Sequence, residues 1–423
     1  MPNETNNAEV PASKNENKEK KALVKHKKAL QKRPNPFLYY PAARIYARLL
    51  CKFKFNMVES GERVKGPALL ISNHTSNDDY KFIAAAVRPA RITFLVTYHF
   101  FTFKKLAPWL KAIGAIPKYQ FATDLEAMRK IQYVVQKEKG VVYIAPEGTV
   151  YGSGHLGYIS PAIAKMVRFL KVPVYACKIE GAGLGNAKWS VHKHKGKVSI
   201  QTKKIIDGAE STTLTPDQIM ERITSYLTYN EFDFQKRENF KIKGDDKARG
   251  FETMFYKCPC CGSEFKLRTE GNDVYCPECG VRATFQDDFT FKWAGDKQYF
   301  ENYSQWYDWQ YDAVKKEVEK PDFKMEAEVD YGIDRPGVDN YVKVGHGVLT
   351  FTHDGWDYNG TYMDRQIHEH DDPLTVFIAT LKAGKHFELP NRDGHNRVFY
   401  PEDANTSMKW HLASLALSES LKQ

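Results

Sequence analysis

The stretch from Ala68 to Asp79 reads Ala-Leu-Leu-Ile-Ser-Asn-His-Thr-Ser-Asn-Asp-Asp and joins an apolar run to a polar turn. The run predicts a short strand, and the residues from Asp78 to Val87 predict a helix. A strand that gives way to a helix here can bring the Asp79 carboxylate back onto the His74 imidazole. An aspartate bonded to one ring nitrogen fixes the tautomer and leaves the other nitrogen as a base. Such a base can deprotonate a hydroxyl, a step worth roughly 100- to 10,000-fold in rate.

The residues that follow continue the alternation of strands and helices. Further strands are predicted at residues 92–97, 141–145 and 172–179. Thr123-x-x-Glu126 predicts a capping box for a helix that Gly140 ends, and Thr215-Pro216 predicts the start of a later helix. We therefore expect an α/β domain with a largely parallel or mixed sheet and helices on its faces. In such sheets, sites form where strands end and loops begin.

The spacing of His74 and Asp79 is weakly specific by itself, because the chain contains thirteen histidines. Its companions along the chain are, in order, Gly114-Ala115-Ile116-Pro117, Pro146-Glu147-Gly148-Thr149 and Val172-Pro173-Val174. In this order and at this spacing, the residues resemble the glycerolipid acyltransferases, the lysophosphatidic acid acyltransferase family. That family has Asn-His-x4-Asp as its first motif, Phe-Pro-Glu-Gly-Thr-Arg as its third and a Val-Pro-Val strand as its fourth. The resemblance covers roughly residues 36–235, about half of the chain.

The resemblance implies a reaction and a role for each motif residue. His74 would be the general base for an acceptor hydroxyl that attacks an acyl thioester, and Asp79 would be its orienting partner. Glu147, Gly148 and Thr149 would help to hold the acceptor. The donor would be acyl-CoA or an acyl carrier protein. The acceptor would be a lysophospholipid similar to 1-acylglycerol-3-phosphate, as in phospholipid biosynthesis.

Two positions depart from the family pattern. Val150 continues the third motif in place of arginine, and Gln120 stands where the second motif ends in arginine. In the family, those arginines are associated with the phosphate of the acceptor. Either lysines now bind the phosphate, namely Lys118 with Lys111 or Lys165, or the acceptor is another lysolipid or a glycolipid. A non-catalytic lipid-binding or scaffolding protein that kept the fold is the alternative to an enzyme.

The N-terminal region favours contact with an anionic membrane surface. The formal net charge of the chain is +10, and its acidic residues concentrate in the C-terminal third. Residues 1–33 are lysine-rich and predict a disordered basic tail. Residues 36–56 predict a helix. On it, Arg44, Arg48 and Lys52 form one basic stripe among apolar side chains, which suits a helix lying in the lipid interface. An ordinary amphipathic helix packed on its own domain is the alternative.

Apolar stretches of the chain are short. The longest uncharged one, residues 92–103, falls below the about 20 residues that a membrane-spanning helix needs. Residues 1–17 contain no apolar signal-peptide core. We therefore expect a cytoplasmic protein held peripherally on the inner face of the membrane. Its expected partners are membrane lipid and a lysolipid acceptor, with acyl carrier protein as an alternative donor.

Five of the seven cysteines lie between residues 258 and 279. Two knuckles of the form Cys-Pro-x-Cys-Gly supply four thiolates, which suit tetrahedral Zn²⁺ in a reducing compartment. These thiolates belong to Cys258, Cys261, Cys276 and Cys279. Cys260 is the odd thiol and is not expected to be a ligand. A structural zinc ribbon is favoured, and no nucleic-acid partner is expected because the region that follows is acidic. Cys51 and Cys177 are expected to be inert core thiols.

After Arg282 the chain is aromatic and strand-like, which predicts a mostly antiparallel β domain with a C-terminal helix. The predicted strands span residues 341–351, 355–363, 375–378, 387–390 and 397–400, and the helix spans residues 403–421. In outline this region resembles pleckstrin-homology-like or GRAM-like domains. Phosphoinositide binding is not expected, because the region is acidic. A solvated acidic loop is predicted at Asp364, Glu369, Asp371 and Asp372.

The predicted organisation has four parts. They are a disordered basic tail (1–33), an acyltransferase-like domain with an N-terminal membrane-docking helix (34–245), a zinc ribbon (250–285) and a β-rich accessory domain (286–423). Four further histidines lack a partner comparable to Asp79 and are interpreted as structural or surface residues. They are His99, His155, His192 and His194.

Overall fold

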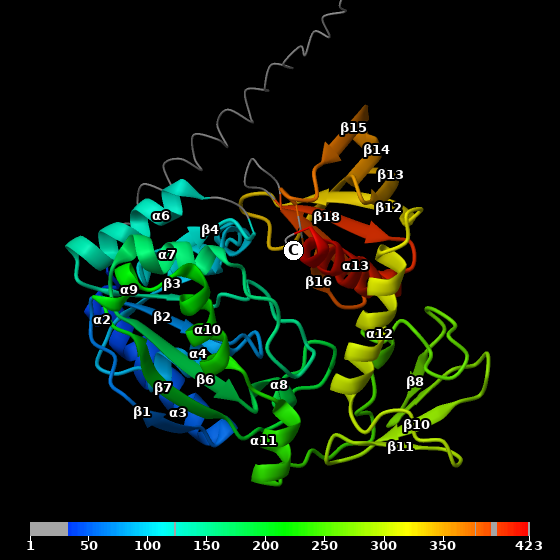
Figure 1. Cartoon of the computed structure of the whole chain (residues 1–423), viewed down its shortest axis with the longest axis horizontal. Coiled ribbons are helices and arrows are strands. Elements are labelled where there is room, and N and C mark those ends of the chain that lie inside the picture. Colours follow the sequence, from blue (N-terminus) through cyan, green and yellow to red (C-terminus); the bar gives the residue numbers. More distant parts are fainter. Residues whose placement is uncertain (1–32, 122–123, 377, 391–395, 422–423) are drawn as a thin grey trace, which may run out of the picture.

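Figure 1 shows the computed structural model of the chain, which describes residues 33–121, 124–376, 378–390 and 396–421. Residues 1–32, most of the predicted basic tail, lie outside the described residues. The α/β part lies on one side of the molecule, and two antiparallel sheets lie on the other side. Helix α12 (Tyr303–Val318) runs between those two sheets.

Seven strands form the mixed sheet of the N-terminal half, in the order β1-β7-β6-β2-β5-β3-β4. β6 and β7 pair antiparallel, and the other neighbours pair parallel. The strands are β1 (Val58–Gly61), β2 (Ala68–Ser72), β3 (Ile92–Thr97), β4 (Ile116–Lys118), β5 (Val141–Ile144), β6 (Val174–Glu180) and β7 (Ser199–Ile206). Because β2, β5 and β3 run parallel, their carboxyl ends meet at one edge of the sheet.

Alternate side chains of the central strand β2 enter two different hydrophobic cores. Ala68 and Leu70 pack with residues of α3 and α4, whereas Leu69 and Ile71 pack with residues of α6, α7 and α10. Helices therefore cover both faces of this sheet (Figure 1). The helical segments are α2 (Pro36–Leu38), η1 (Tyr39–Tyr46), α3 (Ala47–Phe55), α4 (Asp79–Ala86), η2 (Tyr98–Phe101), α5 (Leu106–Ala112), α6 (Leu125–Gln132), η3 (Tyr133–Lys137), α7 (Ala162–Leu170), α8 (Ala182–Gly185), α9 (Glu210–Thr213), α10 (Pro216–Leu227) and α11 (Glu231–Glu238).

The α/β prediction is confirmed for this half, with two local corrections at α6. The strands predicted from residues 68, 92, 141 and 172 are β2, β3, β5 and β6, and α10 starts at the predicted N-cap Thr215, whose capping box with Gln218 was not predicted. At α6, however, the N-cap is Asp124, whose carboxylate reaches the N–H of Ala127. Thr123 lies outside the described residues. After η3, it is Lys139 and not Gly140 that takes the left-handed conformation.

The cysteine-rich region forms a four-stranded antiparallel sheet in the order β11-β10-β9-β8. Its strands are β8 (Arg268–Glu270), β9 (Asp273–Tyr275), β10 (Arg282–Phe285) and β11 (Phe291–Trp293), and η4 (Phe251–Thr253) precedes them. Phe285 and Trp293 belong to a core that continues into α12 through Trp306. The same core includes Trp189 of the α/β part. Burial of apolar side chains therefore joins this sheet to both of its neighbours.

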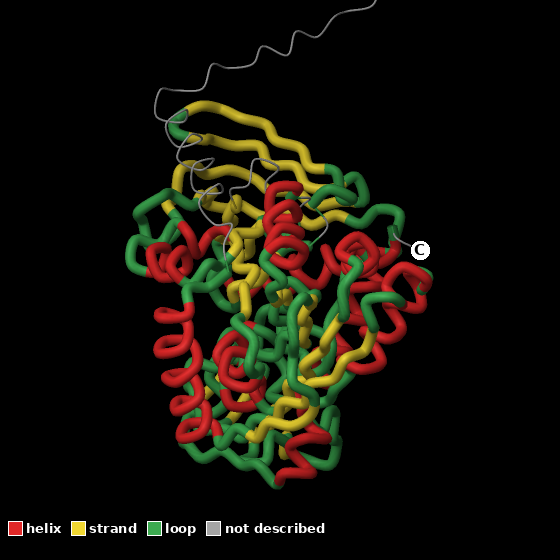
Figure 2. The backbone as a smooth tube through the Cα atoms, turned by 90° about the vertical axis from the view of Figure 1, so that its left-hand side faces the viewer, coloured by secondary structure: helices red, strands yellow, loops and turns green. Residues whose placement is uncertain are grey.

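The C-terminal region forms a seven-stranded antiparallel sheet in the order β15-β14-β13-β12-β18-β17-β16. Figure 2 shows its strands side by side at the top of the molecule. Trp410 of the last helix stacks on Trp356 and Phe387 of the sheet. The elements are β12 (Lys324–Ile333), β13 (Val342–Thr352), β14 (Gly355–Tyr362), β15 (Arg365–Asp371), β16 (Thr380–Lys382), β17 (His386–Pro390), β18 (Asn396–Pro401), η5 (Ala404–Thr406) and α13 (Ser407–Ser420).

The antiparallel sheet with its closing helix confirms the predicted architecture of this region, but three details were wrong. α12 and β12 were not predicted. Thr375 and Val376 form a turn instead of a strand, and Ile378 beyond them packs against Tyr151 and Leu415. Two residues of the predicted acidic loop, Glu369 and Asp371, lie on β15. They are placed there by ion pairs of 3.1 and 2.5 Å with the buried Arg397 of β18.

Candidate active site and cysteine cluster

His74 and Asp79 meet in the turn between β2 and α4. His74 Nδ1 lies 2.9 Å from Asp79 Oδ2. The N–H groups and hydroxyls of Thr75 and Ser76 donate to the same carboxylate at 2.8 to 3.2 Å. Because a carboxylate only accepts hydrogen bonds, His74 Nδ1 carries the proton and Nε2 is left with a free lone pair. The Asp79 side chain is 1% exposed and the His74 side chain 25%, so the imidazole can still be reached from outside.

Asn73 explains why the turn keeps this shape. Its side-chain amide donates to the carbonyl of Ile179 at 2.7 Å and accepts from the N–H of the same residue at 2.8 Å. The Asn73 side chain therefore continues the hydrogen bonding between β2 and β6 one residue beyond the end of β2. Below it, the Ser72 hydroxyl and the Tyr143 hydroxyl lie 2.8 Å apart and connect β2 to β5. Both contacts are buried, so they hold His74 at the edge of the sheet.

Glu147 follows β5 and fixes the main chain of His74. Its Oε1 accepts the His74 N–H at 2.6 Å, and its Oε2 accepts the Gly157 N–H at 2.8 Å. Burial raises the pKa of Glu147 to about 7, although both backbone hydrogen bonds lower it. The sequence predicted that Glu147 holds the acceptor. In the structure both of its oxygens are engaged by the main chain, and the side chain is buried.

The positions that depart from the family pattern lie beside the same loop. Gln120 donates its side-chain amide to the carbonyl of Gly148. Gly148 has a φ of 71°, and a Cβ there would lie 2.8 Å from a ring carbon of Phe121, so this position requires glycine. Thr149 and Val150 are buried. The carbonyl of Val150 accepts a hydrogen bond from the ammonium of Lys188 at 2.5 Å.

The predicted substrate-binding lysine ends β4. The Lys118 ammonium donates to the carbonyl of Tyr119 at 2.5 Å. Lys118 lies two residues before Gln120, the glutamine that contacts Gly148. Lys111 and Lys165 are exposed on α5 and α7. Through the side chain of Gln120, the segment of Lys118 is thus in contact with the loop of Gly148 and Thr149. A different lysine, Lys188, contacts the position of the missing arginine.

Glu231 is a further buried carboxylate near the turn, beside Asp79 and Glu147, and no sequence pattern indicated it. It opens α11, where its oxygens accept the N–H groups of Gly181 and Gly183 at 2.5 and 3.0 Å. Burial raises its pKa to about 8. Together with Thr75 and Tyr229 it lines a cavity of ≈ 10 Å³, room for about one water molecule. Its partners lie about 50 residues away in the chain, so only the folded structure relates them.

Three of the four other histidines have acidic neighbours that were not predicted from the sequence. His155 Nε2 lies 2.8 Å from Asp308 Oδ1, and His192 Nε2 lies 3.0 Å from Asp246 Oδ2. His99 Nδ1 lies 4.0 Å from a carboxylate oxygen of Asp334, and its ring stacks on another side chain of the C-terminal region. These carboxylates are all distant in sequence. The two expected core thiols, Cys51 and Cys177, are buried, and burial raises the pKa of each to about 12.

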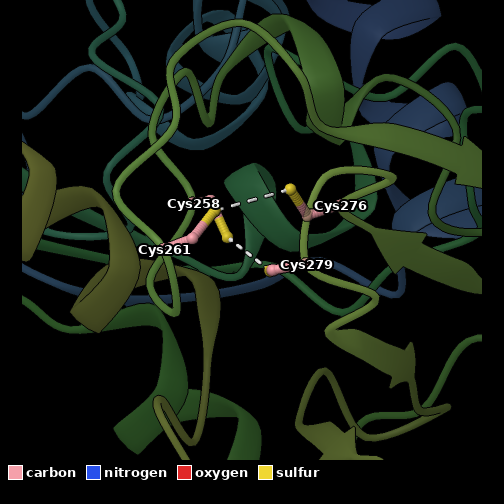
Figure 3. Close-up of side chains that lie close together, drawn as sticks. All are labelled: Cys258, Cys261, Cys276 and Cys279. Carbon is pink, nitrogen blue, oxygen red and sulfur yellow. Dashed lines mark hydrogen bonds between the residues drawn. The ribbon is translucent and has the colours of Figure 1, made fainter.

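The four predicted metal-binding cysteines converge from two loops, as Figure 3 shows. Their sulfur atoms all lie within 4.8 Å of one another. Cys258 Sγ is 3.7 Å from Cys279 Sγ, and Cys261 Sγ is 3.9 Å from Cys276 Sγ. Four bonds of about 2.3 Å to a tetrahedral zinc ion would place sulfurs roughly 3.8 Å apart, so the cluster fits the metal.

The two knuckles repeat the same backbone turn. The N–H of Cys258 donates to Ser263 and that of Cys276 to Val281, at 2.9 and 3.0 Å. In each knuckle, a left-handed glycine donates back to the carbonyl of the first cysteine. Cys260 is exposed and lies outside the four-sulfur group. The four sulfurs therefore form a closed set, which would leave no position for a substrate on a tetrahedral metal ion.

A closed ion network fastens the first knuckle to the C-terminal helices. Lys257 pairs with Glu264 and Glu317 at 3.0 and 3.2 Å. Lys409 pairs with the same two carboxylates at 2.7 Å each. The four side chains are all less than a third exposed. Glu317 lies on α12 and Lys409 on α13, so the cysteine-rich sheet and the C-terminal region share one polar anchor.

The N-terminal helical segment presents an apolar side to solvent. Tyr39, Cys51 and Phe55 are buried against the α/β domain. The opposite side exposes Phe37, Ile45, Tyr46, Leu49 and Phe53. Arg44 lies over the ring of Tyr40, and Arg48 pairs with Glu59. None of the helices in the described ranges has both the length and the apolarity that a membrane span requires.

Comparison with known proteins found a similarity within the α/β part. Residues 55–180 match the protein-family model Acyltransferase. This range contains the turn of His74 and Asp79 as well as Glu147 and its loop. This part of the chain is therefore similar to an acyltransferase domain.

One solved structure illustrates the similarity. The crystal structure of the 1-acyl-sn-glycerophosphate (LPA) acyltransferase PlsC from Thermotoga maritima matches with a TM-score of 0.38 and 15% sequence identity. The match covers 55% of this chain and 86% of that chain. A search of curated proteins gave no significant match.

Proposed function

We propose that this protein is an O-acyltransferase that moves a fatty acyl chain from a thioester to a hydroxyl of a lysolipid in phospholipid biosynthesis. The observation that carries the proposal is the buried Asp79 carboxylate that holds His74 Nδ1 inside an acyltransferase domain. The donor is acyl-CoA or acyl carrier protein. The acceptor is a lysophospholipid of the 1-acylglycerol-3-phosphate type or a related lysolipid.

The chemistry follows from the tautomer of His74. Asp79 accepts a hydrogen bond from Nδ1–H, so Nε2 is free to take the proton of the acceptor hydroxyl. The hydroxyl oxygen attacks the thioester carbonyl carbon and forms a C–O bond. The tetrahedral intermediate then collapses, the C–S bond breaks, and the proton on Nε2 passes to the leaving thiolate. The products are the acylated lipid and a free thiol, and His74 returns to its starting state.

Glu147 acts in this scheme as a positioning residue for His74, because its two oxygens hold main-chain N–H groups on both sides of the site. Gly148, Thr149 and Lys118 are assigned to acceptor binding. The contact of Gln120 with Gly148 supports this assignment, since it sets the segment that carries Lys118 against the loop after β5. Lys118 would serve a phosphate as a point charge where the family has arginine.

Docking to the cytoplasmic face of an anionic membrane is proposed for the segment from α2 to α3. Its exposed side carries aromatic and aliphatic side chains, and basic residues flank them. This composition suits a helix lying in the lipid interface. A vesicle flotation assay tests it, with Phe53→Asp expected to weaken binding to anionic vesicles. Unchanged binding by that variant and by Leu49→Asp would contradict the assignment.

Structural zinc is proposed for Cys258, Cys261, Cys276 and Cys279, on the support of their 3.7 and 3.9 Å sulfur separations. The metal would crosslink the two knuckles and would take no part in acyl transfer. Elemental analysis of the purified protein should give about one zinc per chain. Cys276→Ser should lose that metal and lower the melting temperature, whereas the matched control Cys260→Ser should keep both. Zinc-free wild-type protein purified without chelator would contradict the proposal.

Product identification tests the proposed reaction. The full chain would be incubated with acyl-CoA or acyl carrier protein and a panel of lysolipids and glycolipids in anionic vesicles. Mass spectrometry should detect one acylated class of acceptor. If phosphate-monoester acceptors are preferred and Lys118→Gln removes that preference, Lys118 binds the phosphate. If other lysolipids are preferred and Lys118→Gln changes nothing, the acceptor is of a different class and the assignment of Lys118 fails.

A further inference from the structure

The connection from β3 to β4, formed by η2 and α5, leaves apolar side chains exposed. On α5, Leu110 is buried in a small core with Phe101 and Ala115, and Ala107 is buried as well. Leu106 and Trp109 lie three residues apart on the outward side of this helix, and the Trp109 residue is 57% exposed. An outward-facing tryptophan beside other exposed apolar groups is typical of an interaction surface.

A loop of the C-terminal region extends this surface. The N–H of Gly337 donates to the carbonyl of Thr102 at 2.8 Å, and Asp339 accepts the N–H of Lys104 at 2.9 Å. Between these two contacts, Val338 is exposed. We call the resulting surface the α5 patch. It comprises Phe100, Leu106, Trp109 and Val338, with the exposed Lys104, Lys105 and Lys111 around them.

The composition of the α5 patch favours an anionic lipid surface as its occupant. Residues 98–112 include three lysines and no acidic residue, and the loop of Val338 adds one exposed carboxylate, that of Asp339, so lysines still outnumber carboxylates on this surface. Tryptophan and lysine together suit the headgroup region, where an aromatic ring enters the apolar boundary and an ammonium meets anionic lipid. A stable protein interface buries about 20 to 30 residues on each side, far more than these seven.

The position of the α5 patch relates it to the candidate active site. His74 follows the carboxyl end of β2, and η2 follows the carboxyl end of β3. β5 alone lies between these two parallel strands, so their ends are about 10 Å apart. A bilayer that contacts the α5 patch would therefore lie next to the edge of the sheet that holds His74.

From these observations we infer that the α5 patch is a second lipid-contacting surface, separate from the α2–α3 segment, which holds the catalytic edge of the sheet against an anionic bilayer. The inference rests on the proposed function only for its purpose, namely delivery of the acceptor hydroxyl to His74. Lipid contact itself can be measured on the full chain without any turnover.

Tryptophan fluorescence offers a specific test, because the six other tryptophans are buried or half-buried. Vesicles of phosphatidylcholine and phosphatidylglycerol with brominated acyl chains should quench the wild-type emission, and Trp109→Phe should abolish that quenching. Quenching that persists in Trp109→Phe would overturn the inference. This result is independent of acyl transfer, so a protein without turnover can still show the contact.

A partition measurement with a matched control completes the test. Leu106→Asp should lower the partition coefficient onto these vesicles about tenfold, since an apolar group would be replaced by a charge. Leu374→Asp, at a 62% exposed leucine of the C-terminal region, should bind like wild type. Equal binding by all three proteins would overturn the inference. So would a dimer in sedimentation that Leu106→Asp dissociates, because the occupant would then be a second copy of the chain.

Discussion

Two histidine–carboxylate pairs of this molecule have nearly the same geometry and very different surroundings. His74 and Asp79 are 2.9 Å apart, and His155 and Asp308 are 2.8 Å apart. The two imidazoles have similar exposure, 25% and 34%. The carboxylates differ, because Asp79 is 1% exposed and Asp308 is 53% exposed. Asp79 also accepts hydrogen bonds from Thr75 and Ser76, which hold it in one orientation.

A short distance between imidazole and carboxylate therefore does not by itself make the histidine a base. At Asp308, water competes for the carboxylate and the pair can separate at little cost. At Asp79, separation would leave buried donors without an acceptor, which costs about 1 to 3 kcal/mol for each. Only the buried pair therefore keeps one tautomer of its histidine, and the proposed chemistry needs that tautomer.

The largest expected effect is on the two histidines. His74→Ala should lower the rate of acyl transfer by about 100- to 10,000-fold, the range that a general base contributes. His155→Ala should change it by less than about twofold, as is usual for surface substitutions. Steady-state kinetics with one donor and one acceptor measures both. Similar losses in the two variants would show that the burial of Asp79 does not distinguish the pairs.

The two carboxylates give a somewhat smaller contrast. Asp79→Asn should lower kcat by about 100-fold, because an amide has no charge to stabilise the imidazolium and its NH2 group would face donors whose hydrogen bonds a carboxylate oxygen now accepts. Asp308→Asn should leave kcat unchanged. Circular dichroism and urea unfolding would verify that both variants fold. If folded Asp79→Asn had a kcat close to that of the wild type, Asp79 would not be the residue that orients His74.

Glu147 is a further difference between the two pairs, because of these two histidines only His74 donates its main-chain N–H to a buried carboxylate. Glu147→Gln should lower kcat/KM by about tenfold at pH 8, through loss of one backbone hydrogen bond. The pKa of Glu147 is raised to about 7, so wild-type activity should rise with pH through that value as the carboxylate ionises. Glu147→Gln should lose this part of the pH profile.

The raised pKa of Glu147 also makes the stability of the fold depend on pH. Between the ordinary carboxyl pKa and about 7, Glu147 is protonated in the folded chain and ionised in the unfolded chain. The contribution of Glu147 to the free energy of unfolding therefore falls as pH rises through this window. Urea unfolding of wild type and Glu147→Gln across the window measures the difference. Parallel stability profiles would contradict the burial of an ionisable carboxyl at this position.

The smallest effect concerns the exposed pair. Burial lowers the pKa of His155, but the hydrogen bond and charge of Asp308, the Leu156 carbonyl and the charge of Glu147 together raise it by more, so the pKa lies above its ordinary value. The pair therefore stabilises the fold below the unfolded pKa of about 6.5 and loses this contribution as pH rises through the folded value. A double-mutant cycle of His155→Ala and Asp308→Asn should give a coupling of about 0.5 kcal/mol at pH 6 and none at pH 9. Coupling of equal size at both values would contradict this.

The sequence predicted the elements whose partners are local. The apolar run of residues 68–72 could only be a buried strand, and the turn after it closes within six residues. The two cysteine knuckles repeat a short pattern that sets its own backbone turn. In each case the groups that determine the structure are neighbours in the chain, so residue type and spacing were sufficient.

Features that depend on distant partners could not be predicted in this way. Asp308 is 153 residues from His155, and Glu231 binds the glycines of a loop about 50 residues before it. β15 carries no alternating apolar pattern, since its acidic residues are placed by Arg397 on another strand. α12 was missed because its buried Trp306, Tyr307 and Gln310 resemble the aromatic strands around it in composition. Tertiary contacts decided each of these, and composition alone did not indicate them.

Thiol release by the wild-type protein tests the central claim most directly. Acyl-CoA and acyl carrier protein would be supplied in turn, with and without lysolipid acceptors in anionic vesicles, and free thiol and acylated lipid would be followed together. The account predicts release that depends on the acceptor and matches the acylated product one for one. Absence of release with either donor, from protein that still binds the vesicles, would contradict it and indicate a lipid-binding protein that has kept the acyltransferase fold.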